Sequence, residues 1–172
     1  VITALSNDVE GVREAAFNSA KAIIEIYATK STSLLLPVIE KGILDPIWRI
    51  RESSVDLLGR LIFKLSGKSL QKAAEDEEIL SFTDHQTKLM KEAIGEEQWH
   101  KILSLLYLLR SDGAYTVRTN ALNIWKIVVS NTPRTVNQIV SPLMSLVIDA
   151  LSEHGTDQQQ TAAACLGELV RK

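Results

Sequence analysis

Residues 34–67 show the clearest alternation of hydrophobic and polar positions in the chain. After Asp45-Pro46, small or apolar residues recur at three- and four-residue steps, as in a helix buried on one side. Proline suits the first turn of a helix, and an aspartate before it can accept bonds from free backbone N–H groups. We therefore predict two antiparallel helices joined at this corner. The second helix would bury Ile47, Ile50, Ser54, Leu57, Leu58, Leu61 and Leu65, and expose Arg49, Glu52, Asp56 and Arg60.

The second helix of this pair carries a pattern that recurs along the chain. An arginine follows an apolar residue and precedes two core positions, three and seven residues further on. The positions are Arg13 with Ala16 and Ala20, Arg51 with Ser54 and Leu58, Arg118 with Ala121 and Trp125, and, more loosely, Gln159 with Ala162 and Leu166. Their spacings are 38, 67 and 41 residues. Two of these lie near the ~40-residue period of two-helix HEAT or armadillo repeats, and the third allows an insertion.

We predict an all-α fold, a solenoid of HEAT/armadillo-like repeats over residues 1–30, 31–66, 85–130 and 133–172. Residues 67–85 form an acidic insertion with weak periodicity, which we expect to be a disordered loop. Gly95 is expected to break one helix and Pro142 to bend another. Neither end shows a polar capping unit, so we expect a piece of a longer array. In the first repeat the expected inward residues are Val12, Ala16, Ala20, Ile23, Ile24 and Tyr27.

Composition narrows the class only slightly. The 172 residues are 45% hydrophobic and carry a formal charge of −2, which favours a folded chain and disfavours a surface built wholly for nucleic acid. The single Cys165 allows no internal disulfide and suits a reducing compartment. The longest uncharged stretch, 135–148, contains Asn, Gln, Ser and Pro. We therefore expect a cytoplasmic protein that does not enter a membrane.

No group of residues predicts an enzyme, a metal site or a cofactor. Gly67-Lys68-Ser69 imitates the end of a phosphate-binding loop, but Ile62 stands where the first glycine is needed and a helix precedes it. Cys165 sits in a small-residue run typical of core packing, and His154 could pair with it only in principle. His85 and His100 have no partner at ligand spacing. The run 75–78, with four carboxylates, lacks the pattern and glycine of a calcium loop.

Aspartates precede the first three repeated arginines by five or six residues. Stacked repeats bring equivalent residues side by side, so a ladder of charge-assisted hydrogen bonds along the turns is predicted. Its members would be Asp8, Arg13, Asp45, Arg51, Asp112 and Arg118.

A cluster of cations lies where the second helix of the 34–67 pair ends. A helix C-terminus favours cations by itself. The alternative is an anionic partner such as ribosomal RNA, since phosphate binding needs only clustered Lys and Arg. The candidate RNA contacts are Arg60, Lys64, Lys68 and Lys72, together with Arg49, which lies outside the repeated frame beside an exposed-looking Trp48.

Three segments resemble the general-control translational activators, a family of very large HEAT-repeat proteins of the amino-acid starvation response. They are residues 34–67, where WRIR is followed by SSV and LLG, residues 117–135, with IWKIVVSNTPRT, and LGELVRK at 166–172. The resemblance covers most of the chain from Leu34 and includes the acidic insertion. Gln158-Gln159 stands where the family pattern has a basic pair, which removes that repeat from a charge ladder.

The resemblance implies a cytoplasmic, non-enzymatic scaffold that binds translating, stalled or collided ribosomes. It further implies an ABC-type ATPase partner, and a protein kinase of initiation factor two alpha that is recruited through its RWD domain. This stretch would be a spacer or a ribosome-facing arc, with the kinase site elsewhere. The fold alone also allows a generic HEAT adaptor for proteins, as in transport or phosphatase regulation.

Overall fold

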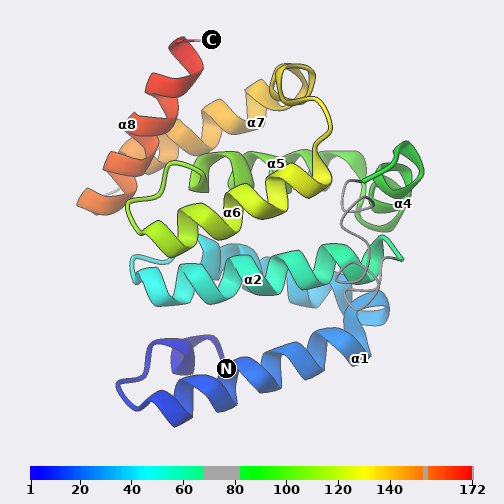
Figure 1. The fold of residues 1–172 in the computed structure, drawn as a ribbon, viewed down its shortest axis with the longest axis vertical. Helices are drawn as coiled ribbons and strands as arrows, with labels where there is room; N and C mark the ends of the chain where they lie inside the picture. Colours follow the sequence, from blue (N-terminus) through cyan, green and yellow to red (C-terminus); the bar gives the residue numbers. More distant parts are fainter. Residues whose placement is uncertain (68–81, 153–154, 172) are drawn as a thin grey trace. The chain divides into compact units, whose positions relative to one another are not determined.

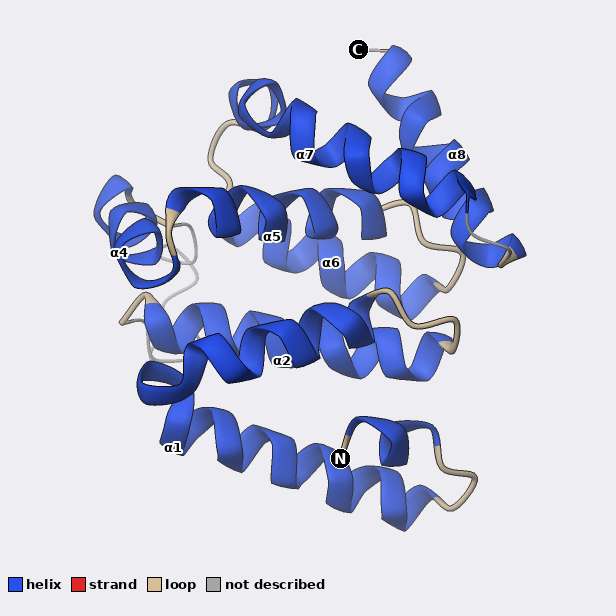
Figure 2. Cartoon of the chain, turned by 180° about the vertical axis from the view of Figure 1, so that it is seen from behind, coloured by secondary structure: helices blue, strands red, loops and turns tan. Residues whose placement is uncertain are grey.

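The computed structural model describes residues 1–67, 82–152 and 155–171. Within this part every regular element is a helix (Figure 2). The chain divides into two compact units. The first contains residues 1–67 and 84–94 of the described part, and the second contains residues 82–83, 95–152 and 155–171.

The first unit consists of a short 3₁₀ helix and three α-helices, seen in Figure 1. They are η1 (Ile2–Ser6), α1 (Glu10–Ile43), α2 (Trp48–Leu65) and α4 (Asp84–Ile94). The backbone of Ser31 inside α1 is not helical, with φ −130° and ψ 25°, so α1 is two helices joined at a kink. The proposed boundary between repeats 1–30 and 31–66 falls at this residue.

By length and composition alone, α1 is apolar enough to cross a membrane, although one such helix is weak evidence. The kink at Ser31 interrupts the helix, and Pro37 lies in its second part. The part before the kink carries six charges, on Glu10, Arg13, Glu14, Lys21, Glu25 and Lys30. Helix α1 packs against α2 and η1.

The contact between α1 and α2 is close because Gly42 of α1 faces Ser54 of α2. A Cβ added at Gly42 would overlap the Ser54 hydroxyl and lie 3.1 Å from its Cβ. One turn before Ser54 on α2, Ile50 packs against Leu5 and Ala16. Position 54 and its equivalents are all buried, as the repeated frame requires: Ala16, Ser54, Ala121 and Ala162.

The inward face predicted for the first repeat was partly wrong. Ala16, Ala20 and Ile24 are buried, and the buried stripe continues to Ala28 at four-residue steps. Three other residues predicted to point inward are exposed instead: Val12 (41%), Ile23 (37%) and Tyr27 (50%). A stripe at strict four-residue steps is narrow, so apolar residues flanking it remain in water. Ile47 is also exposed, because it caps α2 and lies outside its first turn.

The second unit contains α5 (Glu96–Leu109), α6 (Tyr115–Val128), α7 (Thr132–Ser152) and α8 (Thr156–Val170). Helix α5 packs against each of the other three. It is accordingly buried on nearly all sides, from Trp99 and from Ile102 through Leu109. A helix that is apolar all round is typical of the centre of a helical unit.

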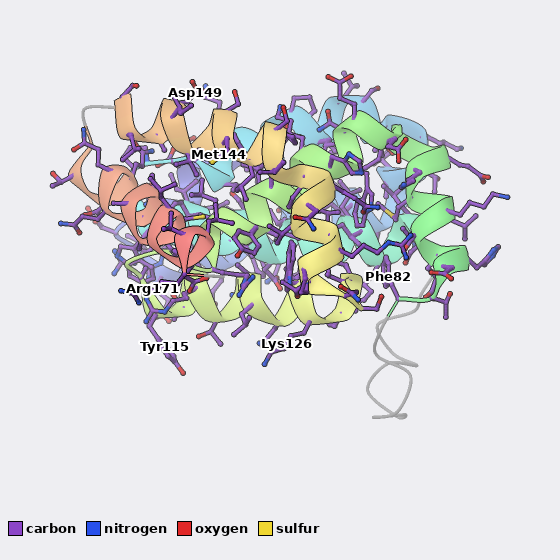
Figure 3. The ribbon with its side chains drawn as sticks, turned by 90° about the horizontal axis from the view of Figure 1, so that it is seen from above. Phe82, Tyr115, Lys126, Met144, Asp149 and Arg171 are labelled. Carbon is purple, nitrogen blue, oxygen red and sulfur yellow. The ribbon has the colours of Figure 1, made fainter. Side chains whose placement is uncertain are left out.

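Gly95 and Pro142 act on the helices as expected. Gly95 has φ +87°, a region that favours glycine, and it separates α4 from α5. Helix α7 changes direction along its length (Figure 3) and contains Pro142, which has no N–H to donate to the carbonyl four residues earlier. The predicted insertion 67–85 lies largely outside the described residues. At its end, however, Phe82 is buried and its amide donates to the Ile127 carbonyl at 2.6 Å.

Candidate functional site

Three corners that precede second helices share one hydrogen-bonded turn. In each, a side-chain oxygen accepts a bond from the backbone N–H two residues later, which is the geometry of an Asx turn. The residue with that N–H then caps the helix in an extended conformation, with φ between −84° and −77°. The bonds are Val9 N–H to Asn7 Oδ1 (2.9 Å), Ile47 N–H to Asp45 Oδ1 (2.9 Å) and Ala114 N–H to Asp112 Oδ1 (2.8 Å).

The repeated arginine closes each corner. It stands four residues after the cap, and its Nη1 donates to two main-chain carbonyls of the turn. Arg13 reaches Asn7 O (2.6 Å) and Asp8 O (3.0 Å), Arg51 reaches Asp45 O and Pro46 O (both 2.9 Å), and Arg118 reaches Asp112 O (2.6 Å) and Gly113 O (3.4 Å). A charged donor shared by two backbone acceptors ties the helix to its own turn.

In the first corner, Asn7 and not Asp8 holds the position of Asp45 and Asp112. An Asx turn needs a side-chain oxygen, and the amide of asparagine supplies one as well as a carboxylate does. Sequence reasoning missed Asn7 because it searched for a charge. A strict six-residue spacing from Arg13 would have found it.

Gln159 occupies the equivalent position in α8. Its cap Gly155 has φ −87° and ψ 120°, like the other three caps, and the Gln159 N–H bonds to the Gly155 carbonyl at 3.1 Å. Its side-chain amide donates to Leu151 O at 3.3 Å. The four positions are therefore equivalent in their backbone, although the fourth has no charge.

These bonds stay within each corner. The predicted ladder, in which charges would link one corner to the next, is a different arrangement and stays a prediction. What the geometry supports directly is a locking role for each arginine at its own turn.

Two of the predicted cations near the end of α2, Arg60 and Lys64, form ion pairs, one within α2 and the other with α1. Arg60 Nε is 3.0 Å from Asp56 Oδ2, and Lys64 Nζ is 2.9 Å from Glu25 Oε2 of α1. Their side chains remain between 31% and 53% exposed. Exposed pairs of this kind contribute little to stability, typically about 0–1 kcal/mol.

Sequence reasoning missed Lys21 and Phe17 of α1, which adjoin the same cations. Lys21 Nζ lies 4.9 Å from the centre of the Phe17 ring, and the Arg60 guanidinium lies 6.0 Å from it. The four-residue spacing of Phe17, Lys21 and Glu25 puts these residues on one side of α1. This spacing could have indicated the contact if α1 had been placed beside α2. We call Lys21, Arg60 and Lys64 the cation row.

Arg49 does not belong to the cation row. It lies in the first turn of α2, fifteen residues before Lys64, which at 1.5 Å per residue places it about 22 Å away along the helix. Its guanidinium lies 4.9 Å from the centre of the Trp48 ring. The other two predicted RNA contacts, Lys68 and Lys72, lie outside the described residues.

The second unit encloses a charged group among aromatic rings. The Arg110 guanidinium lies 4.6 Å from the Tyr107 ring centre and 5.4 Å from that of Trp125, and its Nη2 is 3.9 Å from Glu168 Oε2 of α8. Burial, with a smaller contribution from Glu168, raises the pKa of Cys165 to about 11. Burial likewise raises the pKa of Tyr107. Both groups are therefore neutral at pH 7.

The remaining candidates for chemistry do not converge. Among the described residues no group of three or more His, Cys, Asp or Glu side chains could hold a metal ion. His100 lies 3.9 Å from Glu96, one turn earlier on the same helix. His154, Lys68, Ser69 and the acidic run 75–78 lie outside the described residues.

Comparison with known proteins decides the family. The HEAT-repeat family model matches residues 35–65. Over its whole length the chain is 40% identical to the human stalled ribosome sensor GCN1, 34% identical to the eIF-2-alpha kinase activator GCN1 of Saccharomyces cerevisiae and 41% identical to the protein ILITYHIA of Arabidopsis thaliana. The chain is homologous to a segment of the GCN1 proteins. It spans 6% of the length of each of these relatives.

The resemblance to general-control translational activators is thereby confirmed. The match to the HEAT model and the all-helical described part also confirm the predicted fold class, an all-α solenoid of HEAT type. The similarity extends over the entire length of this chain.

Proposed function

We propose that this chain is part of a non-enzymatic scaffold in translational control that associates with ribosomes and helps to activate the kinase of initiation factor two alpha. The observation that carries the proposal is 31–40% identity along the full chain to proteins named as a stalled ribosome sensor or as an eIF-2-alpha kinase activator. The setting would be the cytoplasm during amino-acid starvation.

The resemblance of the sequence to general-control translational activators supports a proposal about the partners. The scaffold would act with an ABC-type ATPase and would recruit the kinase through its RWD domain, both through regions other than this one. This chain would contribute a HEAT-repeat arc facing the ribosome. A helical array that presents side chains at regular intervals suits a large, irregular partner.

Contact with ribosomal RNA would use Arg60 and Lys64 near the end of α2, together with Lys68 and Lys72, which follow α2 in the sequence. Arg49 is left out of this set because of its distance along the helix. The carboxylates of Asp56 and Glu25 hold Arg60 and Lys64 in place while no phosphate is bound. Since the pairs are exposed and weak, a phosphate oxygen can replace each carboxylate at little cost.

Co-sedimentation of the full-length protein with ribosomes tests this proposal. The triple variant Lys64→Glu, Lys68→Glu, Lys72→Glu should lose its salt-sensitive association. Each phosphate that the variant no longer neutralises should flatten the plot of log affinity against log salt by roughly 0.7–0.9. Lys126→Glu is the matched control, because Lys126 is an exposed lysine of α6 that extends into solvent (Figure 3).

Unchanged sedimentation of the triple variant would remove the end of α2 from the contact. Absence of ribosome association by the unaltered protein would instead favour the alternative, a generic HEAT adaptor in transport or phosphatase regulation.

A further inference from the structure

We propose that the corner between α1 and α2 docks a protein segment in which carboxylates flank apolar side chains. The surface comprises Leu44, Ile47, Trp48 and Arg49, and we call it the tryptophan corner. It goes beyond the proposed contact with RNA, because it names a second surface and a different class of partner.

The tryptophan corner exposes three large apolar side chains to solvent. Leu44 is 39% exposed, Ile47 is 44% exposed and Trp48 is 40% exposed. The other two tryptophans of the chain, Trp99 and Trp125, are each 2% exposed. Burying an indole is among the larger hydrophobic gains that a side chain offers, so an exposed one with apolar neighbours indicates a contact surface.

Arg49 gives the corner its charge. Within the described residues its guanidinium makes no hydrogen bond or ion pair, and it lies over the Trp48 ring. The neighbouring cations are committed elsewhere: Arg51 to its turn, and Arg60 and Lys64 to carboxylates. Stacking on the indole holds the planar guanidinium while leaving its donors available for a carboxylate.

The surroundings favour protein over RNA as the partner. Interfaces with nucleic acid are polar and need several cations, whereas the corner offers one cation and three apolar side chains. Tryptophan and arginine are the residues most enriched at the energetic centres of protein interfaces. Four residues form an anchor for a short segment and are too few for a standard interface of ~1,600 Å².

The equivalent corner of the second unit provides a matched control. Tyr115 is the first residue of α6, as Trp48 is of α2, and it is 70% exposed. The Arg118 guanidinium lies 5.7 Å from its ring centre, but Nη1 of Arg118 is bonded to its own turn. The residues before and after Tyr115 are Ala114 and Thr116, which supply neither an apolar patch nor a second cation.

The test measures binding of a designed peptide to the full-length protein by fluorescence anisotropy. The probe is a fluorescein-labelled helical peptide with leucines on one face and glutamates along its edges, and a second probe has lysines in place of the glutamates. We expect the glutamate probe to bind. Arg49→Glu should weaken it roughly tenfold to hundredfold, the cost of removing a charge-assisted bond. The lysine probe should prefer the Arg49→Glu variant to the unaltered protein.

Tyr115→Ala should leave binding of the glutamate probe unchanged, and Trp48→Ala should abolish it. Folding is not at risk in Arg49→Glu, because the residue is exposed and a glutamate suits the first turn of a helix. Failure of the glutamate probe to bind, or equal effects of Arg49→Glu and Tyr115→Ala, would overturn the proposal. Loss of ribosome co-sedimentation in Arg49→Glu with peptide binding intact would assign the corner to RNA and overturn it as well.

Discussion

The guanidinium of each repeated arginine donates hydrogen bonds to backbone carbonyl oxygens of its own turn. Arg51 is the best enclosed of them, at 3% exposure, and its Nη1 lies 2.9 Å from the carbonyls of both Asp45 and Pro46. A lysine at this position could not reproduce the planar fork that serves two acceptors at once. The corner therefore depends on the shape of the guanidinium as well as on its charge.

Arg51→Ala should lower the free energy of unfolding of the chain by about 1.5–3 kcal/mol, because two partly buried hydrogen bonds lose their charged donor. Arg51→Lys should recover less than half of this loss. Urea denaturation followed by circular dichroism measures both. Arg49→Ala, two residues away and exposed, should change stability by less than ~0.5 kcal/mol, and an equal loss in both alanine variants would contradict the locking role.

The buried thiol of Cys165 makes the free energy of unfolding depend on pH in the alkaline range. Its pKa is raised from 9.0 to about 11 by burial, so the folded state keeps the thiol proton that the unfolded chain loses first. The stabilisation that the protonated thiol contributes to the folded state is complete below pH 9 and is lost as the pH rises toward 11. The free energy of unfolding should fall there by up to about 1.4 kcal/mol per pH unit.

Cys165→Ala should reduce this slope, and Tyr107, whose pKa is also raised, accounts for part of what remains. Denaturation midpoints at pH 8, 9, 10 and 11 measure the effect. Identical slopes for the variant and the unaltered chain would show that the thiol ionises equally in both states.

At the residue scale, periodicity found the arginines but not all of their neighbours. The spacing in sequence located Arg13, Arg51 and Arg118 because it follows one helix. Lys21 and Phe17 belong to α1, so their place beside Arg60 of α2 became apparent only from the packing of the two helices. Contacts between helices depend on how the two helices pack, and the spacing within one helix does not state that.

Among the elements, the pair α1 and α2 shows how tightly two helices can approach. Gly42 allows the approach, and the Ser54 hydroxyl in the contact is buried without a hydrogen-bond partner in the described residues. A buried hydroxyl of this kind destabilises the fold. The three equivalent positions carry alanine: Ala16, Ala121 and Ala162.

Gly42→Ala should therefore destabilise the chain by about 1–3 kcal/mol through steric overlap with Ser54. Ser54→Ala alone should leave stability unchanged or raise it by about 1 kcal/mol, since the hydroxyl has no partner to lose. Thermal unfolding of both single variants, and of the double variant Gly42→Ala with Ser54→Gly, checks the reasoning. The double variant should recover most of the loss, and a loss as large as that of Gly42→Ala alone would place the strain elsewhere.

The boundaries of the helices were anticipated where a local rule applied. Gly95 separates α4 from α5 through its positive φ. Asp45-Pro46 lies in the turn before α2, which begins at Trp48, so Pro46 is not in the first turn of the helix as predicted. The predicted faces were less accurate on α1, where Val12 and Tyr27 proved exposed. Periodicity identifies the apolar side of a helix, but the width of the buried stripe depends on how many neighbours cover it.

For the molecule as a whole, residues at equivalent positions of the repeats differ in how much of their surface is exposed to solvent. The residue before the repeated arginine is 41% exposed at Val12, 3% at Ile50 and 0% at Val117. Ile50 is covered by Leu5 and Ala16, which belong to the preceding corner. Such differences cannot be read from a repeated pattern, which treats every copy alike.

Val117→Ala should cost roughly 2 kcal/mol, from lost burial and the cavity left behind. Val12→Ala should cost nothing or add up to about 0.5 kcal/mol, since alanine is the better helix former and little burial is lost. Chemical denaturation of the two variants compares the same substitution at equivalent positions. Equal losses would mean that Val12 is buried in solution.

The corner arginine donates its hydrogen bonds to main-chain oxygens, so these bonds do not depend on most of the side chains between the arginine and the turn. Asp8, Pro46 and Gly113 follow the Asx residue in the three corners, and each offers the same carbonyl. The identity of the second residue of such a corner is therefore free to vary, in evolution or by mutagenesis, without weakening the connection between the two helices of the hairpin.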